Sequence, residues 1–152
     1  MRVLMLGATI LALVALSEGR PAAVQGNAAA AIKNPVASTE QSLAAGKQSY
    51  IRSCGSCHGL SGTGGEAPEE SLDPGPPPPN LVDGSWDHGS TDGEIFANIK
   101  SGIPNTNPEY SLNKKYMEPW GDRLTDQEIW NVVNYIRSLE KETLQNRGRR
   151  AS

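Results

Sequence analysis

The chain has 152 residues, with 14 Lys and Arg against 17 Asp and Glu and a formal net charge of −3 at pH 7. This length suits one domain with a modest core. The mildly acidic charge argues against a nucleic-acid partner, because phosphate binding requires a basic surface.

The start of the chain predicts two segments outside the folded body. Residues 3–16 are uncharged and mainly apolar, and they follow a basic start at Arg2. This run is short for a membrane span and fits a secretory signal peptide. We therefore expect residues 1–17 to be a signal peptide and the protein to be exported. An uncleaved segment would instead anchor it to a membrane. Residues 18–38, rich in Ala with scattered Pro and Gly, are expected to form a flexible linker.

The first helix is predicted over residues 39–52. Ser38 or Thr39 can cap it, and Gly46 and Tyr50 share one of its faces. A glycine inside a helix costs about 1 kcal/mol relative to alanine. We therefore expect another element to cross closely over Gly46.

A second helix is predicted over residues 92–100. Thr91 and Glu94 have the spacing of a capping box, and Ile95 and Ile99 lie on its apolar side. No strand pattern precedes or follows it. The predicted fold is therefore all-α.

The third helix is the most clearly marked. Thr125 and Glu128 form a second capping box. Its apolar positions follow the helical period and are Ile129, Val132, Val133, Ile136 and Leu139. The predicted domain thus covers residues 39–144, and residues 145–152 are expected to be a basic disordered tail. Long loops join the three main helices, and such loops are uncommon unless something organises them.

The chemistry is concentrated in residues 54–58, Cys-Gly-Ser-Cys-His. The C-x-x-C-H pattern is typical of covalent haem attachment. Thiols at Cys54 and Cys57 can reach the two vinyl groups on one edge of a porphyrin, and His58 is then carried under the ring to bind iron. We predict one covalently bound haem c with His58 as an iron ligand.

Three other interpretations of this motif are less favoured. A thioredoxin-like redox pair expects a βαβ context, which is not predicted here. A zinc site would need four ligands, and Cys54, Cys57, His58 and His88 include two adjacent residues and no second paired motif. A disulfide across two residues would be strained.

The second axial ligand is predicted to be Met117. Met1 and Met5 fall in the predicted signal peptide, so Met117 and His88 are the remaining candidates besides an open position. A thioether favours ferrous iron and raises the reduction potential relative to two histidines. His88 remains the alternative ligand, or else a loop histidine near the haem edge.

Three aromatic side chains near these residues carry an N–H or O–H group. They could contact a haem propionate or simply pack on the ring. They are Trp86, Tyr116 and Trp120.

On these motifs the chain resembles the class I monohaem cytochrome c family over the whole predicted body. Pro79-Asn80-Leu81 is similar to the family's Pro-x-Leu segment. The resemblance implies that the Pro79 carbonyl accepts the ring N–H of His58 and that Leu81 packs on the haem. It also implies that the first helix crosses the last one at Tyr135.

The resemblance implies a small cytochrome c-like fold wrapped around one haem. It implies a periplasmic electron carrier, expected to be a monomer and not an enzyme, with no small-molecule substrate. The expected partners are redox proteins, namely a dehydrogenase, a respiratory complex or an oxidase. One alternative is a fixed electron-entry subunit of a dehydrogenase or oxidase complex. Another is a haem enzyme or gas sensor with an open sixth position.

Overall fold

The computed structural model describes residues 28–65, 77–104, 106 and 115–151, with only the backbone given at 115 and 116. The predicted signal peptide, 1–17, and the first part of the predicted linker, 18–27, lie outside the described residues. In the described part of the chain, no helix has the length and apolar character needed to cross a bilayer.

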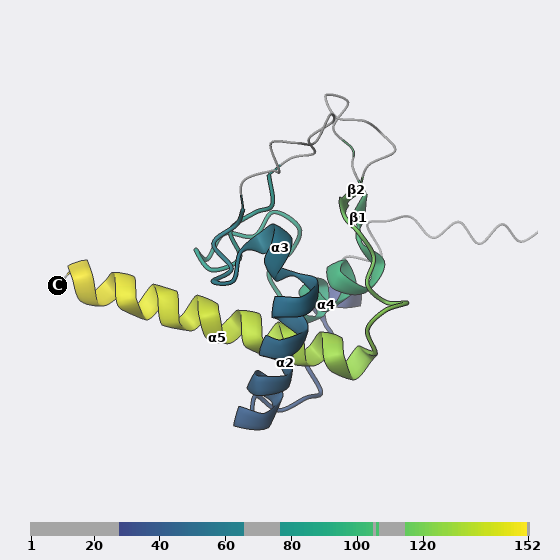
Figure 1. Cartoon of the computed structure of the whole chain (residues 1–152), viewed down its shortest axis with the longest axis horizontal. Helices are drawn as coiled ribbons and strands as arrows, with labels where there is room; N and C mark the ends of the chain where they lie inside the picture. The colour runs from purple at the N-terminus through teal and green to yellow at the C-terminus, as the bar shows by residue number, and fades with distance from the viewer. Residues whose placement is uncertain (1–27, 66–76, 105, 107–114, 152) are drawn as a thin grey trace, which may run out of the picture.

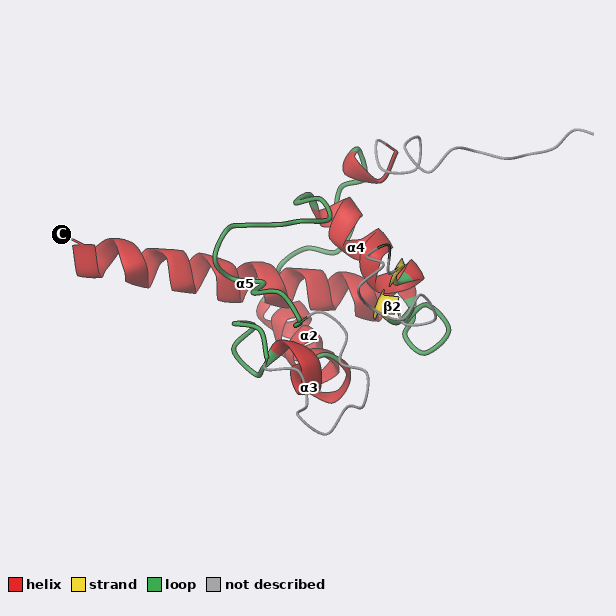
Figure 2. Ribbon diagram, turned by 90° about the horizontal axis from the view of Figure 1, so that it is seen from above, coloured by secondary structure: helices red, strands yellow, loops and turns green. Residues whose placement is uncertain are grey.

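The described chain is mainly helical, which confirms the predicted all-α class (Figures 1 and 2). The three predicted helices are α2, α4 and α5. The elements are α2 (Glu40–Ser53), α3 (Gly55–His58), α4 (Asp92–Ser101), β1 (Ile103–Pro104), β2 (Lys115–Met117) and α5 (Asp126–Ala151).

Each main helix begins at the cap that the sequence predicts. The Thr39 hydroxyl accepts a hydrogen bond from the backbone N–H of Ser42 at 3.2 Å. Thr91 and Glu94 form a complete capping box at α4. The Glu128 carboxylate accepts bonds from Thr125 in the same way at α5. These side chains satisfy backbone N–H groups that have no partner inside the helix.

Helices α2 and α5 cross in close contact. A Cβ atom at Gly46 would lie 2.0 Å from the carbonyl oxygen of Asn131, which no side chain could occupy. Next to this contact the rings of Tyr50 and Tyr135 meet edge to face, with centroids 5.4 Å apart. The predicted close crossing over Gly46 is therefore confirmed.

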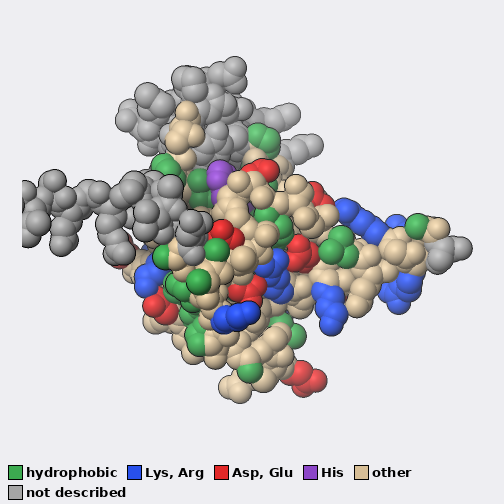
Figure 3. Space-filling view, turned by 180° about the vertical axis from the view of Figure 1, so that it is seen from behind, with side chains coloured by type: hydrophobic (Ala, Val, Ile, Leu, Met, Phe, Trp, Pro, Cys, Tyr) green, Lys and Arg blue, Asp and Glu red, His purple; other side chains and the backbone are tan. Residues whose placement is uncertain are grey.

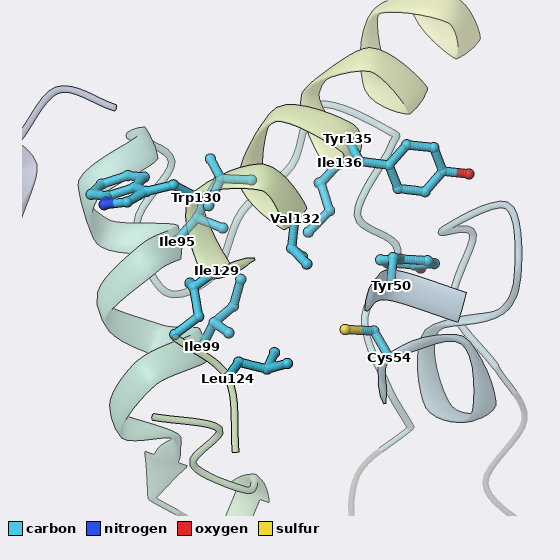
Figure 4. Close-up of a cluster of buried hydrophobic side chains, with 11 residues drawn as sticks. Tyr50, Cys54, Ile95, Ile99, Leu124, Ile129, Trp130, Val132, Tyr135 and Ile136 are labelled. Carbon is cyan, nitrogen blue, oxygen red and sulfur yellow. The ribbon is translucent and has the colours of Figure 1, made fainter. Parts of the chain in front are cut away.

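Helix α4 packs on the other side of α5 through a stacked aromatic pair. The rings of Phe96 and Trp130 lie 4.0 Å apart at 15°. Ile129 and Val132 of α5 are fully buried, and Ile95 and Ile99 of α4 are nearly so (Figure 4). Burying an aliphatic side chain of this size contributes about 2 kcal/mol. Helix α5 therefore supplies the centre of the core to both neighbours.

Two short strands were not predicted. Strand β1 pairs antiparallel with β2, and Ile103 lies opposite Met117. Each strand is only two or three residues long. Segments this short show no alternating pattern in a sequence.

The prediction of a disordered tail over 145–152 is corrected by the structure, because α5 continues to Ala151. Residues such as Glu142 and Gln145 favour a helix, and Arg149 and Arg150 suit its C-terminal end. This end extends beyond the rest of the molecule and carries exposed basic side chains (Figures 1 and 3).

The described part of the predicted linker, 28–38, is also more ordered than expected. Residues 28–30 form one helical turn, and the Asn34 amide bonds to Trp130 and Asn134 of α5. Ordered contacts therefore begin before residue 39. Composition alone suggested flexibility, whereas specific hydrogen bonds hold this segment to the body.

Candidate cofactor site

The Cys-x-x-Cys-His motif lies on one helical turn. Helix α2 ends at Ser53, and the N–H groups of Cys57 and His58 donate to the carbonyl of Cys54 at 3.1 and 2.9 Å. Residues three and four positions apart lie on the same side of a helix. Gly59 then ends α3 with a φ of 73°, a conformation that favours glycine. Both cysteines and His58 therefore share one side of this turn.

The two cysteines differ in environment. Cys54 is 7% exposed, whereas Cys57 is exposed, and no disulfide joins them. Burial raises the pKa of the Cys54 thiol to about 11, and the nearby Cys57 adds to the rise. Figure 4 shows the Cys54 sulfur pointing into the core cluster, on the side of Leu124 and Val132.

The structure brings His58 and Pro79 together. The Nδ1 atom of His58 lies 3.4 Å from the Pro79 carbonyl oxygen. Gly64 brings the two segments together. Its N–H donates to the His58 carbonyl at 3.1 Å, and a Cβ atom at this position would lie 2.8 Å from the Pro78 carbonyl oxygen. Burial lowers the pKa of His58, and the Pro79 hydrogen bond opposes that effect. A neutral imidazole that donates through Nδ1 presents Nε2 as a metal ligand.

Met117 is held on the last strand before α5. The Gly102 backbone packs so closely that a Cβ there would lie 2.6 Å from the Met117 carbonyl. The Trp120 N–H donates to the Ile99 carbonyl at 3.0 Å. These backbone contacts join the methionine loop to the end of α4.

All of the predicted site residues line one cavity of about 380 Å³. They are Cys54, Cys57, His58, Pro79, Leu81 and Met117. Aliphatic side chains from α4, β1 and α5 complete the wall, namely Ile95, Ile99, Ile103 and Ile136. The cavity combines two thiols, an imidazole and a thioether with an apolar wall. This donor set fits a haem, whose apolar ring needs desolvation and whose iron needs two axial ligands.

The structure gives the zinc interpretation no support. Within the described residues, no three His, Cys, Asp or Glu side chains come together as ligands for one ion. His88 lines the same cavity as Met117 and stays the alternative axial ligand.

Trp86 lines the cavity, but its indole N–H is directed elsewhere. It donates to the Glu140 carboxylate at 2.9 Å, which leaves the ring to face the site. Arg137 stacks over this ring at 5.2 Å and pairs with both Glu140 and Asp92 at 2.8 Å. Sequence spacing shows the Arg137–Glu140 pair on α5, but not its junction with Trp86 or Asp92.

Trp120 and Tyr116 are the other two aromatic residues expected near the haem, and only Trp120 has a described side chain. Trp120 lines the cavity, and the Arg123 guanidinium lies 5.1 Å from its ring centroid. The side chain of Tyr116 lies outside the described residues. Tyr50 also lines the cavity, and sequence reasoning had assigned it only to the helix crossing.

Comparisons with known proteins identify the family of this chain. The family model described as cytochrome c matches residues 43–140. The Cbb3-type cytochrome c oxidase subunit FixP of Sinorhizobium medicae is 28% identical over 97 residues, which cover 64% of this chain and 30% of that protein. The chain thus spans less than a third of this curated relative.

Two solved structures were compared with the chain. A chain of the reducing HAO-like protein complex Kustc0457/Kustc0458 of Kuenenia stuttgartiensis has a TM-score of 0.52 and 24% identity, covering 71% of this chain and 49% of that one. Cytochrome cL of Methylophaga aminisulfidivorans has a TM-score of 0.48 and 21% identity, covering 82% and 69%. At this identity, the first of these shows the fold alone.

Proposed function

Since this chain belongs to the cytochrome c family, we propose that Cys54 and Cys57 hold its haem c covalently and that His58 and Met117 are the axial ligands of the iron. The protein is an electron carrier. The observation that supports the ligand assignment best is that these four side chains line one cavity. The bound haem supplies one-electron exchange between ferric and ferrous iron.

The chain orients its own ligands. With the Nδ1–H of His58 donated to the Pro79 carbonyl, Nε2 would be the ring nitrogen left to hold the metal. Pairing of β1 with β2 positions Met117. Leu81 and the aliphatic wall would exclude water from a bound haem, and that exclusion would favour its less charged ferrous state.

Electron exchange takes place at the exposed side of the attachment turn. Cys57 is exposed, and Leu60 beside it is 67% exposed, so a partner can approach closely there. Such redox encounters bury little area and dissociate quickly. The acidic net charge suits a basic patch on the partner, and transfer rates should then fall as salt rises. No substrate binds the metal, and we expect no catalysis by this chain.

A second candidate is a fixed electron-entry subunit of a dehydrogenase or oxidase complex. It is favoured by the similarity to FixP, an oxidase subunit. A free periplasmic carrier would elute from size-exclusion chromatography of a native extract as a monomer, with a mass near 16 kDa or below. Elution with a much larger haem-containing complex would favour the subunit.

Export and processing belong to the same proposal. Removal of residues 1–17 from a periplasmic protein would be seen as a mature N-terminus in intact-mass spectrometry. Retention of that segment together with the membrane fraction would instead favour an anchored carrier.

The ligand assignment is tested by optical spectra of the purified protein in both oxidation states. We expect a covalent haem c spectrum with the weak charge-transfer band of methionine bound to ferric iron. Met117→Ala should abolish this band and lower the reduction potential, because a soft thioether stabilises ferrous iron. His88→Ala is the matched control and should keep the band.

Other spectra would support a different ligand or a different function. If His88→Ala removes the sixth ligand and Met117→Ala does not, His88 is the ligand. A high-spin wild-type spectrum that shifts with carbon monoxide would indicate an open site and favour an enzyme or sensor. A protein without covalent haem would refute the whole assignment.

A further inference from the structure

Residues 28–38 make specific contacts although they lie before the segment that matches the family model, 43–140. We call residues 28–38 the strap. It runs from the helical turn at 28–30 to the start of α2, and in Figure 2 it lies beside α4. Composition predicted a linker here, so these contacts need an explanation of their own.

Asn34 anchors the strap to α5. Its side-chain amide donates to the Trp130 carbonyl at 3.2 Å and to the Asn134 side-chain oxygen at 2.9 Å. Its own side-chain oxygen accepts the Val36 N–H at 2.9 Å. Asn134 in turn donates to the Val36 carbonyl at 3.0 Å and to the Ser42 hydroxyl at 2.9 Å. The side-chain amides of Asn34 and Asn134 each donate and accept hydrogen bonds. This network therefore specifies where the strap lies.

The strap also presses on the first turn of α4. A Cβ atom at Gly93 would lie 2.1 Å from the Ala29 carbonyl oxygen and 2.7 Å from that of Ile32. Only glycine permits this approach. At about 100° per residue, Gly93 is roughly 200° around the helix from Ile95 and 240° from Ile99. Both of those side chains line the cavity, so the strap supports α4 from the side opposite to it.

The position of Met117 depends on the position of α4. Helix α4 ends at Ser101, and β1 follows directly and pairs with the strand that carries Met117. The Trp120 N–H also donates to the Ile99 carbonyl, which joins the methionine loop to α4 a second time. A shift of α4 would therefore move the methionine relative to His58.

We propose that the strap holds α4 against the haem cavity and that Asn34 is a positioning residue for the Met117 ligand. This inference rests on the proposed function, because it takes Met117 as the iron ligand. The strap acts through α4, and none of its residues lines the cavity.

Two variants of the haem-loaded protein test the strap from opposite ends. Asn34→Ala removes the anchor on α5. Gly93→Ala places a Cβ where the strap carbonyls lie, although alanine favours a helix over glycine. A helix α4 that needs no strap would gain order from Gly93→Ala, whereas one that depends on it would lose order. Thr39→Ala is the control, since it removes the α2 cap without touching α4.

Two readouts are compared, hydrogen exchange of residues 92–101 and the charge-transfer band of methionine bound to ferric iron. We expect both strap variants to exchange on the order of tenfold faster in α4 while α2 stays protected. The band should weaken in both below the temperature of global unfolding. Thr39→Ala should leave both the α4 exchange and the band as in the wild type.

The remaining outcomes also test whether the strap holds α4. Slower or unchanged α4 exchange in Gly93→Ala, with the band intact, would overturn the proposal. If Asn34→Ala does not accumulate as folded protein, Gly93→Ala decides alone. If the wild type itself lacks the band, the ligand assignment has failed, and the α4 exchange still shows whether the strap holds that helix.

Discussion

The α2–α5 crossing and the cavity wall share helix α5 but are packed in different ways. At the crossing, backbone meets backbone, since a Cβ at Gly46 would lie 2.0 Å from the Asn131 carbonyl. At the wall, α4, β2 and the segment around Trp86 present side chains toward a cavity of about 380 Å³. The crossing can accept almost no change in volume, whereas the wall is completed by a cofactor. Substitutions at the crossing should therefore act on global stability, and those at the wall on local order and on the haem.

The largest effect is expected for Gly46→Ala at the crossing. The added Cβ would force α2 and α5 apart, and overpacking of this kind destabilises by roughly 3 kcal/mol or more. Denaturant unfolding followed by circular dichroism measures the loss. Gly148→Ala is the matched control, because nothing lies within 4 Å of its Cβ. It should stabilise by up to about 1 kcal/mol. A Gly46→Ala protein as stable as the wild type would mean that the helices do not cross as described.

Tyr50 lies at the boundary between the two regions, and Tyr50→Phe should have the next largest effect. Its hydroxyl donates to the Gly59 carbonyl at 2.9 Å, next to the attachment turn. Leaving that carbonyl without its partner should destabilise by about 1–2 kcal/mol. Urea unfolding of the variant gives the value. Tyr135→Phe keeps the ring pair and should change stability by less than about 0.5 kcal/mol. Equal effects from both variants would contradict a specific role for the Tyr50 hydroxyl.

Glu140→Gln tests the packing of the cavity wall, and we expect it to lower the free energy of unfolding by about 1 kcal/mol. The carboxylate accepts from Trp86 and Arg137, and its side chain is only 13% exposed. An amide keeps part of the hydrogen bonding but loses the ion pair. Thermal unfolding at low and high salt should show a difference from the wild type that shrinks with salt. Glu142→Gln, on the exposed part of α5, is the control. If the two variants behave alike, the junction with Trp86 contributes nothing.

The smallest effect concerns the α4 cap and depends on pH. The Thr91 N–H and hydroxyl both bond to Glu94 and lower its pKa below the ordinary value of 4.5. This carboxylate therefore stabilises the fold above pH 4.5, and the contribution is lost as the pH falls through the lower folded value. Glu94→Gln should flatten the acid limb of the stability profile relative to the wild type.

Thr91→Ala removes the hydroxyl donor and keeps the backbone N–H, so it should flatten the same limb less than Glu94→Gln does. The measurement is the denaturation midpoint at several pH values between neutrality and pH 3. A steeper acid limb in either variant would show that the sign of the pKa shift is wrong.

The sequence indicated most of the fold because helix signals are local. Capping boxes at Thr91 and Thr125 and the apolar period of residues 129–139 depend on neighbours within a few positions. The attachment motif is local as well, since its chemistry needs two thiols and an imidazole on one helical turn. Pro79 and Leu81 came from resemblance to a family, and the structure places both at the cavity.

Errors arose where local composition and tertiary contacts disagree. The predicted linker is rich in Ala, yet the Asn34 amide holds it to α5, about a hundred residues away in sequence. The predicted disordered tail over 145–152 is helical to Ala151. Strands β1 and β2 have no pattern of their own and form only because α4 and the methionine loop lie together.

The sequence by itself predicted the helices, the attachment motif and Met117 as a ligand in preference to the methionines of the predicted signal peptide, because each prediction depends on short-range spacing or on residue chemistry. Only the tertiary structure decided that Trp86 donates to Glu140, that Gly93 lies under the strap and that the six site residues share one cavity. Such contacts join residues far apart in the chain. Their distances follow from how the helices pack, which no local pattern encodes.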